Sequence, residues 1–305
     1  MLLTSSLRIT LVSACLAGNS FGQLWTDAAD KTLPPDFQIQ GEYEGNKMGA
    51  QVIALGKGRF HAVMYPGGLP GAGWDGQNKS LLDGKLEGDK ALFTAAAGSR
   101  SYMAREADKF SATRNFPPKG HKPYSGSISK GVFSGASSTG AQFSLKRIVR
   151  KSPSLGAKPP RDAVVLFDGT KESMKNWQGG RFDEKTGLLN TDGNDIRTKE
   201  KFLNYIMHVE FMLPFKPDAR SQGRGNSGFY QVDMYEMQIL DSFGLMGLNN
   251  ECGGIYQKAD SKVNMCLPPL QWQVYDVDFN SAVMKDAKKE SNAVLTARLN
   301  GVTIH

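Results

Sequence analysis

Short apolar runs separated by glycine and proline dominate the first half of the chain. Runs at 51–55 and 60–65 end at Gly56 and Pro66, and similar runs recur at 131–135 and 141–146. Apolar runs bounded by turn residues predict β-strands and hairpins. A polar stretch over 99–124 predicts a long surface loop, although its basic and aromatic side chains leave contact with a polymer open.

The second half continues with strand patterns. Residues 164–167 predict a buried strand that ends in a turn at 168–170. Residues 205–211 alternate, so that His208 lies on the face opposite the more apolar side chains. Residues 299–305 predict a strand, an Asn300-Gly301 turn and the start of a partner strand. Because a sandwich needs that partner completed, we expect a C-terminally truncated domain with further strands after His305.

Composition supports this all-β interpretation and two domains. The 34 glycines and 14 prolines in 305 residues favour many turns over long helices. The segment 151–162 holds three prolines, which cannot donate to a β-ladder. We therefore expect a linker there, between an amino-terminal β-rich domain of unknown function at 34–150 and a second β-domain at 163–305.

Residues 1–22 have the composition of a secretory signal peptide. Arg8 precedes an apolar run at 9–17, and small residues follow up to Gly22. The run is shorter than the ~20 residues that span a bilayer, so no transmembrane segment is expected. We predict cleavage after Gly22 and a periplasmic or extracellular location. Residues 12–15 also resemble a lipoprotein cleavage box, which leaves lipid anchoring at Cys15 as an alternative.

Two cysteines remain after the leader, Cys252 and Cys266. In an oxidising compartment they could form a disulfide, and two buried thiols without a bond are equally compatible with the sequence. No Cys or His stands at ligand spacing near them, so no metal site is predicted, and no motif predicts a cofactor. The sequence defines no oligomeric state.

The net charge of +7 raises the question of a nucleic-acid partner. The densest basic stretch, at 146–161, lacks interleaved aromatic residues that could stack on bases, and it overlaps the expected linker. A solvated linker explains this charge, and no nucleic-acid partner is expected.

Candidate chemistry lies in the run 235–241. Alternation places Glu236 and Gln238 on one face and Asp241 on the other, and a β-bulge near Leu240 would bring all three together. This spacing resembles the catalytic strand of laminarinase-like glycoside hydrolases. Gln238 replaces the central acid, however, and an amide cannot titrate as the paired carboxylates of a retaining glycosidase do.

Polar and aromatic residues close to glycines flank this run and are candidate sugar-binding positions. They are Asn226, Ser227, Tyr256, Trp272, Tyr275 and Asp276. Glu251 stands just before two further glycines and is a candidate acid. Each of these residues could instead have a structural role in a turn or in the core. The prediction of a sugar-binding site therefore depends on the whole ordered set.

That ordered set resembles the successive motifs of the 3-keto-disaccharide hydrolase family. The resemblance covers 163–305 through the segments 165–169, 195–198, 226–228, 235–241, 251–256 and 272–276. It implies a concanavalin-like jelly-roll sandwich that acts on oligosaccharides or glycosides oxidised at the sugar C3. Residues 34–150 look like a β-domain that accompanies this family in exported bacterial proteins.

The substrate class implied by the resemblance suggests a mechanism. A ketone at C3 acidifies the hydrogen on C2, so one base can remove it and the C1 substituent can leave by elimination before water adds. Glu236 or Asp241 would be the base and Glu251 or His208 the acid. Asn226 and Gln238 would orient the ketone. A laminarinase-like β-glucan hydrolase and a non-catalytic carbohydrate-binding surface protein are the alternatives.

Overall fold

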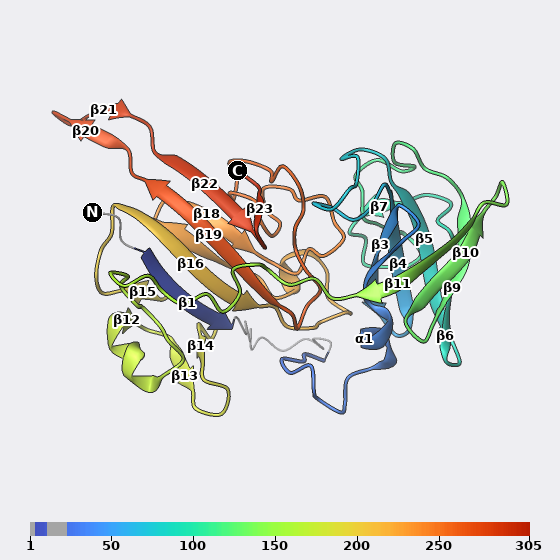
Figure 1. Ribbon diagram of the computed structural model, residues 1–305, viewed down its shortest axis with the longest axis horizontal. Helices are drawn as coiled ribbons and strands as arrows, with labels where there is room; N and C mark the ends of the chain where they lie inside the picture. The colour runs from blue at the N-terminus through green and yellow to red at the C-terminus, as the bar shows by residue number, and fades with distance from the viewer. Residues whose placement is uncertain (1–3, 11–22) are drawn as a thin grey trace.

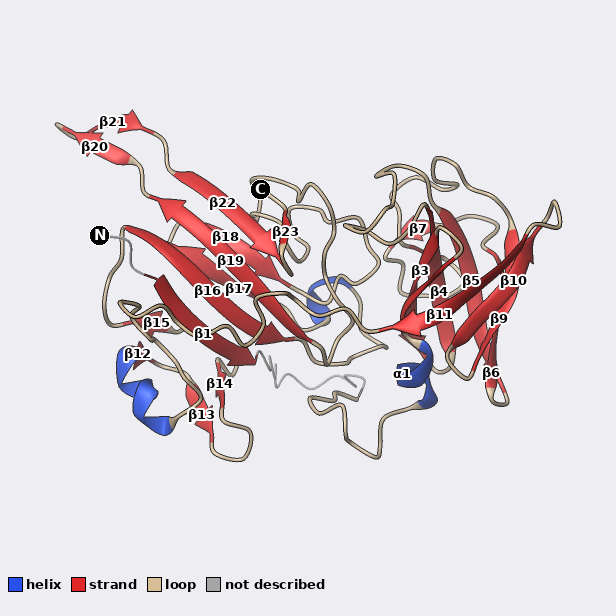
Figure 2. Ribbon diagram, in the orientation of Figure 1, coloured by secondary structure: helices blue, strands red, loops and turns tan. Residues whose placement is uncertain are grey.

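The computed structural model describes residues 4–10 and 23–305, in which strands dominate (Figures 1 and 2). A barrel lies beside a layered β-domain, and the prediction of an all-β chain is confirmed. Helical segments in the described part are short: α1 (Pro35–Ile39) and the 3-10 turns η1 (Lys171–Asn176) and η2 (Ser221–Gly223). None of the described helices has the length and apolar character needed to cross a bilayer.

Eight antiparallel strands close the amino-terminal barrel in the order β10-β11-β2-β3-β4-β5-β6-β9. Their bounds are β2 (Gly41–Gly45), β3 (Met48–Gly56), β4 (Arg59–Pro66), β5 (Ser80–Glu87), β6 (Lys90–Ala95), β9 (Tyr124–Ser129), β10 (Val132–Ser137) and β11 (Gln142–Ile148). The runs predicted at 51–55 and 60–65 lie within β3 and β4, so these strand predictions are confirmed. Closure pairs every barrel strand on both sides, which leaves no open edge.

Aromatic rings fill the barrel. The Phe133 ring centroid lies 4.9 Å from that of Phe93 and 5.2 Å from that of Phe143. The outward faces of β3 and β4 are buried as well, because Ile53 and Tyr65 belong to the core of the second domain. The two halves therefore share apolar surface.

A seven-stranded sheet forms the larger layer of the second domain, in the order β13-β14-β1-β16-β19-β22-β23. Its strands are β13 (Arg181–Asp183), β14 (Leu188–Asn190), β1 (Thr4–Thr10), β16 (Asn204–Met212), β19 (Trp272–Asn280), β22 (Val294–Leu299) and β23 (Val302–Thr303). β1 runs parallel to β14 and β16, and the other pairs are antiparallel. The predicted alternation at 205–211 is confirmed, because Val209 and Phe211 enter the core whereas His208 faces away from it.

A hairpin of β17 (Ser227–Gln231) and β18 (Tyr235–Ile239) forms the second layer. Phe229 packs on Tyr275 of the large sheet with ring centroids 5.3 Å apart, which joins the layers in a jelly-roll-like arrangement. Three two-stranded ladders complete the described strands: β7 (Ser101–Tyr102) with β8 (Phe110–Ser111), β12 (Trp177–Gln178) with β15 (Arg197–Thr198), and β20 (Val283–Lys285) with β21 (Lys288–Ser291).

Two local predictions are wrong and one is confirmed. Residues 164–167 form no strand, because the Leu166 carbonyl accepts side-chain hydrogen bonds from Asn176 (3.1 Å) and Trp177 (2.9 Å) in place of a ladder partner. The expected bulge near Leu240 is absent from the β17–β18 ladder, which pairs without a register shift and ends at Ile239. Asn300 and Gly301 do form the predicted turn, with φ of 52° and 83°, between β22 and β23.

The predicted leader lies mostly outside the described residues. Cys15, the run 11–17 and the proposed cleavage point after Gly22 fall in the undescribed parts, whereas residues 4–10 form β1. Export, cleavage and lipid anchoring stay predictions.

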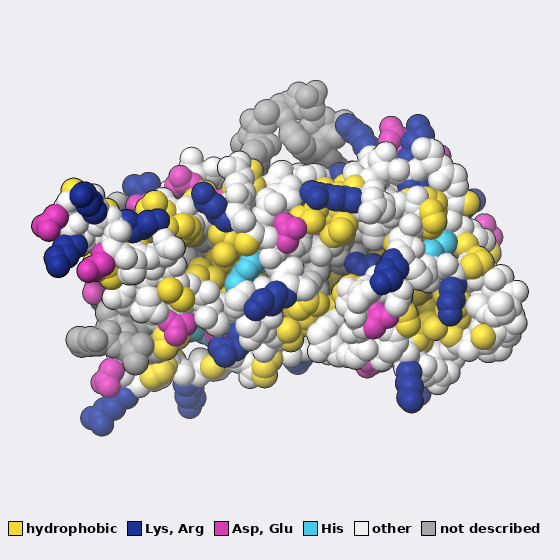
Figure 3. Space-filling model, turned by 90° about the horizontal axis from the view of Figure 1, so that it is seen from above, with side chains coloured by type: hydrophobic (Ala, Val, Ile, Leu, Met, Phe, Trp, Pro, Cys, Tyr) yellow, Lys and Arg dark blue, Asp and Glu magenta, His cyan; other side chains and the backbone are white. Residues whose placement is uncertain are grey.

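The linker is less solvated than we expected. Ser152 is buried, Ser154 Oγ donates to Asp276 Oδ2 at 2.7 Å, and the Gly156 amide donates to Glu210 Oε1 at 2.5 Å. Arg150 pairs with Glu42 of the barrel. On the face seen from above, the remaining basic side chains are scattered rather than gathered into one field (Figure 3).

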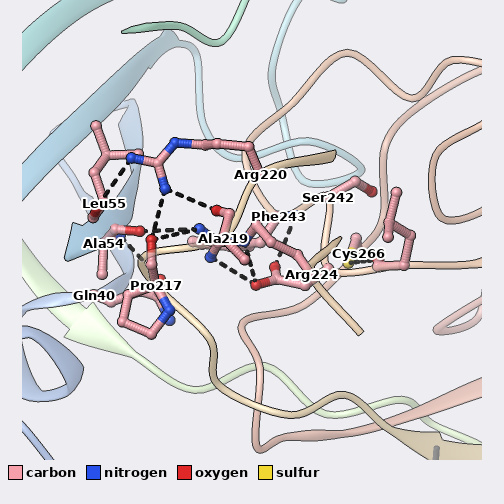
Figure 4. A network of polar contacts seen from close by, with 12 residues as sticks. Gln40, Ala54, Leu55, Pro217, Ala219, Arg220, Arg224, Ser242, Phe243 and Cys266 are labelled. Carbon is pink, nitrogen blue, oxygen red and sulfur yellow. Dashed lines mark hydrogen bonds and ion pairs between the residues drawn. The ribbon is translucent and has the colours of Figure 1, made fainter. Parts of the chain in front are cut away.

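Two arginines of the second domain attach it to the barrel (Figure 4). Arg220 donates to the Leu55 carbonyl at 3.0 Å, and Arg224 donates to the Ala54 carbonyl at 3.1 Å. Both carbonyls belong to β3, so these contacts fix the barrel wall against the segment that leads into β17.

Candidate active site

The face of hairpin β17–β18 that points away from the core carries the main group of polar residues. Tyr230 and Glu236 are directly opposite each other in the ladder, and the Tyr230 hydroxyl donates to Glu236 Oε2 at 2.9 Å. Gln238 follows two residues later and shares this face, because side chains alternate along a strand. A carboxylate, a phenol and an amide are thus gathered on two short strands.

A glycine makes room for the carboxylate. Gly228 pairs with Gln238, and a Cβ at position 228 would collide with the Glu236 side chain. The backbone of Gly228 does not have a positive φ, so space rather than backbone conformation is what glycine supplies here.

Amides surround Gln238, whose side chain is buried. Its terminal group lies 3.2 Å from Gln222 Oε1 and 3.1 Å from Asn226 Oδ1. With the Gln222 and Asn226 amides turned so that their nitrogens donate to the Gln238 oxygen, Gln238 donates to the Ser227 carbonyl at 3.0 Å and to Glu236 Oε1 at 3.1 Å. The predicted residues Asn226, Ser227, Glu236 and Gln238 therefore lie together.

The electrostatic setting favours proton transfer at Glu236. Burial raises the pKa of its carboxyl, the negative charge of Asp195 adds to this, and the Tyr230 hydroxyl partly offsets it. Burial and the hydrogen bond to Glu236 raise the pKa of Tyr230 to about 12. Glu236 is thus a stronger base than an ordinary glutamate, and Tyr230 keeps its proton near neutral pH.

Aromatic surface is exposed next to these groups. Tyr230 is 53% exposed and Tyr256 is 37% exposed, and the Tyr256 amide donates to the Glu236 carbonyl at 2.9 Å. Exposed phenol rings beside a carboxylate and amides suit a polar ligand with an apolar face, such as a sugar ring. The arrangement can perform general acid-base chemistry on such a ligand.

Asp241 does not join this group. It is buried and accepts from Arg224 Nε at 2.9 Å, with Arg224 Nη2 2.6 Å from the same oxygen. Because β18 ends at Ile239 without a bulge, Asp241 turns toward the barrel interface. Its geometry is that of a buried ion pair.

Glu251 lies inside the protein as well. Its carboxylate accepts from the Gly247 amide at 2.6 Å, from the Leu248 amide at 3.1 Å and from the hydroxyl of Tyr102 in the barrel domain. Burial raises the pKa of Glu251, although these hydrogen bonds favour its charged form. The side chain is occupied in tying a loop of the second domain to the barrel domain.

His208 and Asp276 lie on the far side of the large sheet. His208 Nδ1 is 2.6 Å from Asp276 Oδ1, and Nε2 is 3.2 Å from Glu210 Oε1. Burial opposes the imidazolium, but the two carboxylates outweigh it and raise the pKa of His208 to about 9. Since the core separates the two layers, His208 cannot act on a ligand held by Glu236.

The remaining predicted aromatics have different environments. Tyr275 is fully buried and stacks on Phe211 with centroids 5.2 Å apart. Its hydroxyl donates to the Gln238 carbonyl at 2.7 Å, so it supports the strand behind the site and offers no ring to a ligand. Trp272 is half-buried at the start of β19, opposite Met212.

Sequence reasoning missed three residues of this site, Tyr230, Gln222 and Asp195. Pairing 227–231 with 235–239 across the turn at 232–234 would have placed Tyr230 opposite Glu236. Asp195 belongs to a segment that the resemblance included, but no local pattern ties it to Glu236. Gln222 lies in η2, where no periodicity marks it.

The structure also bears on metals and cysteines. Within residues 4–10 and 23–305 no group of three His, Cys, Asp or Glu side chains is arranged to hold a metal ion. Cys252 and Cys266 are both buried and free, with Cys252 Sγ 3.5 Å from the Tyr275 hydroxyl. Of the two alternatives left open, the structure has the unbonded thiols.

Comparison with known proteins agrees with the resemblance. Residues 162–305 match the family described as a 3-keto-alpha-glucoside-1,2-lyase-like domain. The second half of the chain is thus similar to this family over the same segment that its ordered motifs indicated.

One solved structure is similar to part of the chain. It is described as a proposed glycosyl hydrolase from Parabacteroides distasonis ATCC 8503, with 31% identity and a TM-score of 0.43. The match covers 48% of this chain and 65% of that one. No curated protein matches the chain significantly.

Proposed function

We propose that the second domain cleaves 3-keto-glycosides by removing the proton on C2 and eliminating the C1 substituent. The observation that carries this proposal is the Glu236 carboxylate on the outer hairpin face, placed between a phenol and an amide. Elimination needs one base, whereas retaining hydrolysis needs a coupled carboxylate pair. Gln238 stands in place of the central acid of the laminarinase-like pattern, and the second carboxylate of that pattern, Asp241, is paired with Arg224.

The proposed step is balanced by groups of the site and the substrate. The Glu236 carboxylate takes the C2 proton, and the C2–H electrons move toward the C3 carbonyl as an enolate. The C1–O bond then breaks, C1=C2 forms, and the leaving alkoxide takes a proton. Tyr230 is placed to donate that proton, and the Asn226 amide to stabilise the enolate oxygen, while Gln238 holds the Glu236 carboxylate in position. Water adding to the alkene would complete hydrolysis.

Glu236 is preferred to Asp241 as the base, because the Asp241 carboxylate is already engaged by Arg224 in the interior. Glu251 and His208 are poor candidates for the acid on the same ground. Glu251 is buried against Tyr102 and two backbone amides, and His208 lies beyond the core.

The test compares a 3-keto-glucoside with its unoxidised parent, using the protein and its Glu236→Gln variant. We expect turnover of the keto sugar only, a primary isotope effect from deuterium at C2, and a ~10²–10⁴-fold loss of turnover in the variant. Glu290→Gln, at an exposed position on β21, is the matched control and should keep full activity.

Other outcomes decide between the alternatives. Turnover of the unoxidised sugar at an equal rate would favour a β-glucan hydrolase. Binding of both sugars without turnover would favour a carbohydrate-binding surface protein. Full activity in Glu236→Gln would mean that the hairpin face is not the active site.

A further inference from the structure

A second cavity, separate from the hairpin site, lies where the barrel domain meets the second domain. Its volume is about 280 Å³. Loops at 74–79 and 113–119 supply one side, and residues 245–246 and 262–264 of the second domain supply the other. Both domains must be in place for this cavity to exist.

Lys79 is the unusual residue in its wall. The side chain is buried, and its ammonium lies 4.8 Å from the Trp74 ring centroid and 5.6 Å from that of Tyr65. Within the described residues the Lys79 ammonium makes no hydrogen bond. The ammonium thus contacts aromatic rings, while Glu251 acts on it only from beyond ion-pair distance, so Lys79 lacks the directly bonded partner that such groups normally have.

The charges around the cavity all have the same sign. Arg114, Lys119 and Lys262 line it together with Lys79, and no Asp or Glu does. Glu251 is the acid that acts on Lys79 from outside the lining, but its oxygens are occupied by Tyr102 and two backbone amides. Burial lowers the pKa of Lys79 to about 8, against the influence of Glu251, so the lysine is still charged near neutral pH.

The uncharged residues of the cavity wall indicate a ligand larger and less uniformly polar than a simple inorganic anion. The Trp74 ring is partly exposed, and Gln77, Thr113 and Asn115 add amide and hydroxyl groups. Aromatic rings next to such groups suit the apolar face and hydroxyls of a sugar. The volume is at the low end for ligand sites, which fits one ring rather than a chain.

We propose that this interdomain cavity binds an acidic sugar unit, with its carboxylate held by Lys79 and the cationic rim. A carboxylate would give Lys79 the acceptor that the protein does not provide, and it would offset the positive charge of the rim. The proposal does not depend on the reaction assigned to Glu236, because it concerns different residues and a binding event.

The experiment measures binding of glucuronate, glucose and inorganic sulfate by calorimetry on the full chain. We expect glucuronate to bind and glucose to bind at least about tenfold more weakly. In Lys79→Met, which keeps the length of the side chain, glucuronate affinity should fall at least about tenfold, the loss of one charge-assisted hydrogen bond. Lys90→Met, at an exposed position on β6, should bind as the unaltered protein does.

Arg114→Gln gives a second test that does not disturb the interior, because Arg114 is exposed on the rim. It should weaken glucuronate binding and leave the melting temperature unchanged. No glucuronate binding, equal binding of glucose, or sulfate binding as tight as that of glucuronate would each overturn the proposal. Unchanged affinity in both Lys79→Met and Arg114→Gln would overturn it as well.

Discussion

Gly228 lies opposite Gln238 in the hairpin, and the Glu236 side chain passes over it. Because the backbone there is open to any residue, Gly228→Ala changes only the space above the strand. We expect the added methyl group to displace the Glu236 carboxylate and to lower turnover of a 3-keto-glycoside roughly 10–100-fold, as misplacing a reacting group does. Steady-state kinetics, with circular dichroism to verify folding, measure the effect.

Gly223→Ala is the matched control for this prediction. A Cβ at position 223 would meet only the Ala219 side chain, at an ordinary contact distance of 3.5 Å. It should leave turnover unchanged. If Gly228→Ala were as active as Gly223→Ala, the carboxylate position would not matter for the reaction.

At the level of elements, the sequence predicted strands where apolar runs and turn residues coincide, as in β3, β4 and the β22–β23 turn. It also predicted the faces of β16. It failed at 164–167, because a short apolar run looks the same whether its carbonyls join a ladder or accept from Asn176 and Trp177. The sequence also could not predict which way the Asp241 side chain points. That depends on β18 ending at Ile239, and no local pattern marks this strand end.

The outer face of β16 and β19 provides a pH prediction. His208 lies between Asp276 and Glu210, Arg298 acts on Asp276 from β22, and Ser154 of the linker caps Asp276. Since the folded pKa of about 9 exceeds the unfolded value near 6.5, the imidazolium stabilises the fold fully below pH 6.5. This stabilisation, roughly 1–2 kcal/mol after solvent screening, should be lost as the pH rises to about 9.

Urea unfolding between pH 6 and 9.5, for the unaltered protein and His208→Gln, measures this loss. The difference in unfolding free energy between them should shrink across that window. Lys79, whose lowered pKa makes the fold relatively more stable above pH 8, contributes equally to both proteins and cancels. A difference that does not change with pH would contradict the assignment of the charge to His208.

At the level of the whole molecule, the two halves behave as one packed unit. Phe215 of the second domain packs on Trp25 and Phe37, with ring centroids 5.6 and 5.4 Å apart. Ile53 of the barrel packs near Gly244, and Arg220 and Arg224 bond the carbonyls of β3. None of these contacts could be predicted from the sequence, because they join segments about 170–190 residues apart that carry no shared pattern.

Arg224 and Asp241 form the charged part of this interface. Breaking this ion pair tests whether Asp241 has a structural or a catalytic role. Removing one partner of a buried pair leaves an uncompensated charge, so Asp241→Asn should cost about 3–5 kcal/mol of unfolding free energy. Asp192→Asn breaks the exposed pair with Arg181, whose Nε lies 2.7 Å from Asp192, and should cost less than about 1 kcal/mol. Chemical denaturation of both variants provides the comparison.

A double variant makes the test specific. Replacing both partners, as in Arg224→Leu with Asp241→Leu, removes the uncompensated charge and should recover much of the stability that Asp241→Asn loses. Turnover per folded molecule should stay close to that of the unaltered protein in Asp241→Asn, since Glu236 and Tyr230 are untouched. If Asp241→Asn kept its stability but lost turnover ~10²-fold or more, Asp241 would be the base, and the ion pair would open when substrate binds.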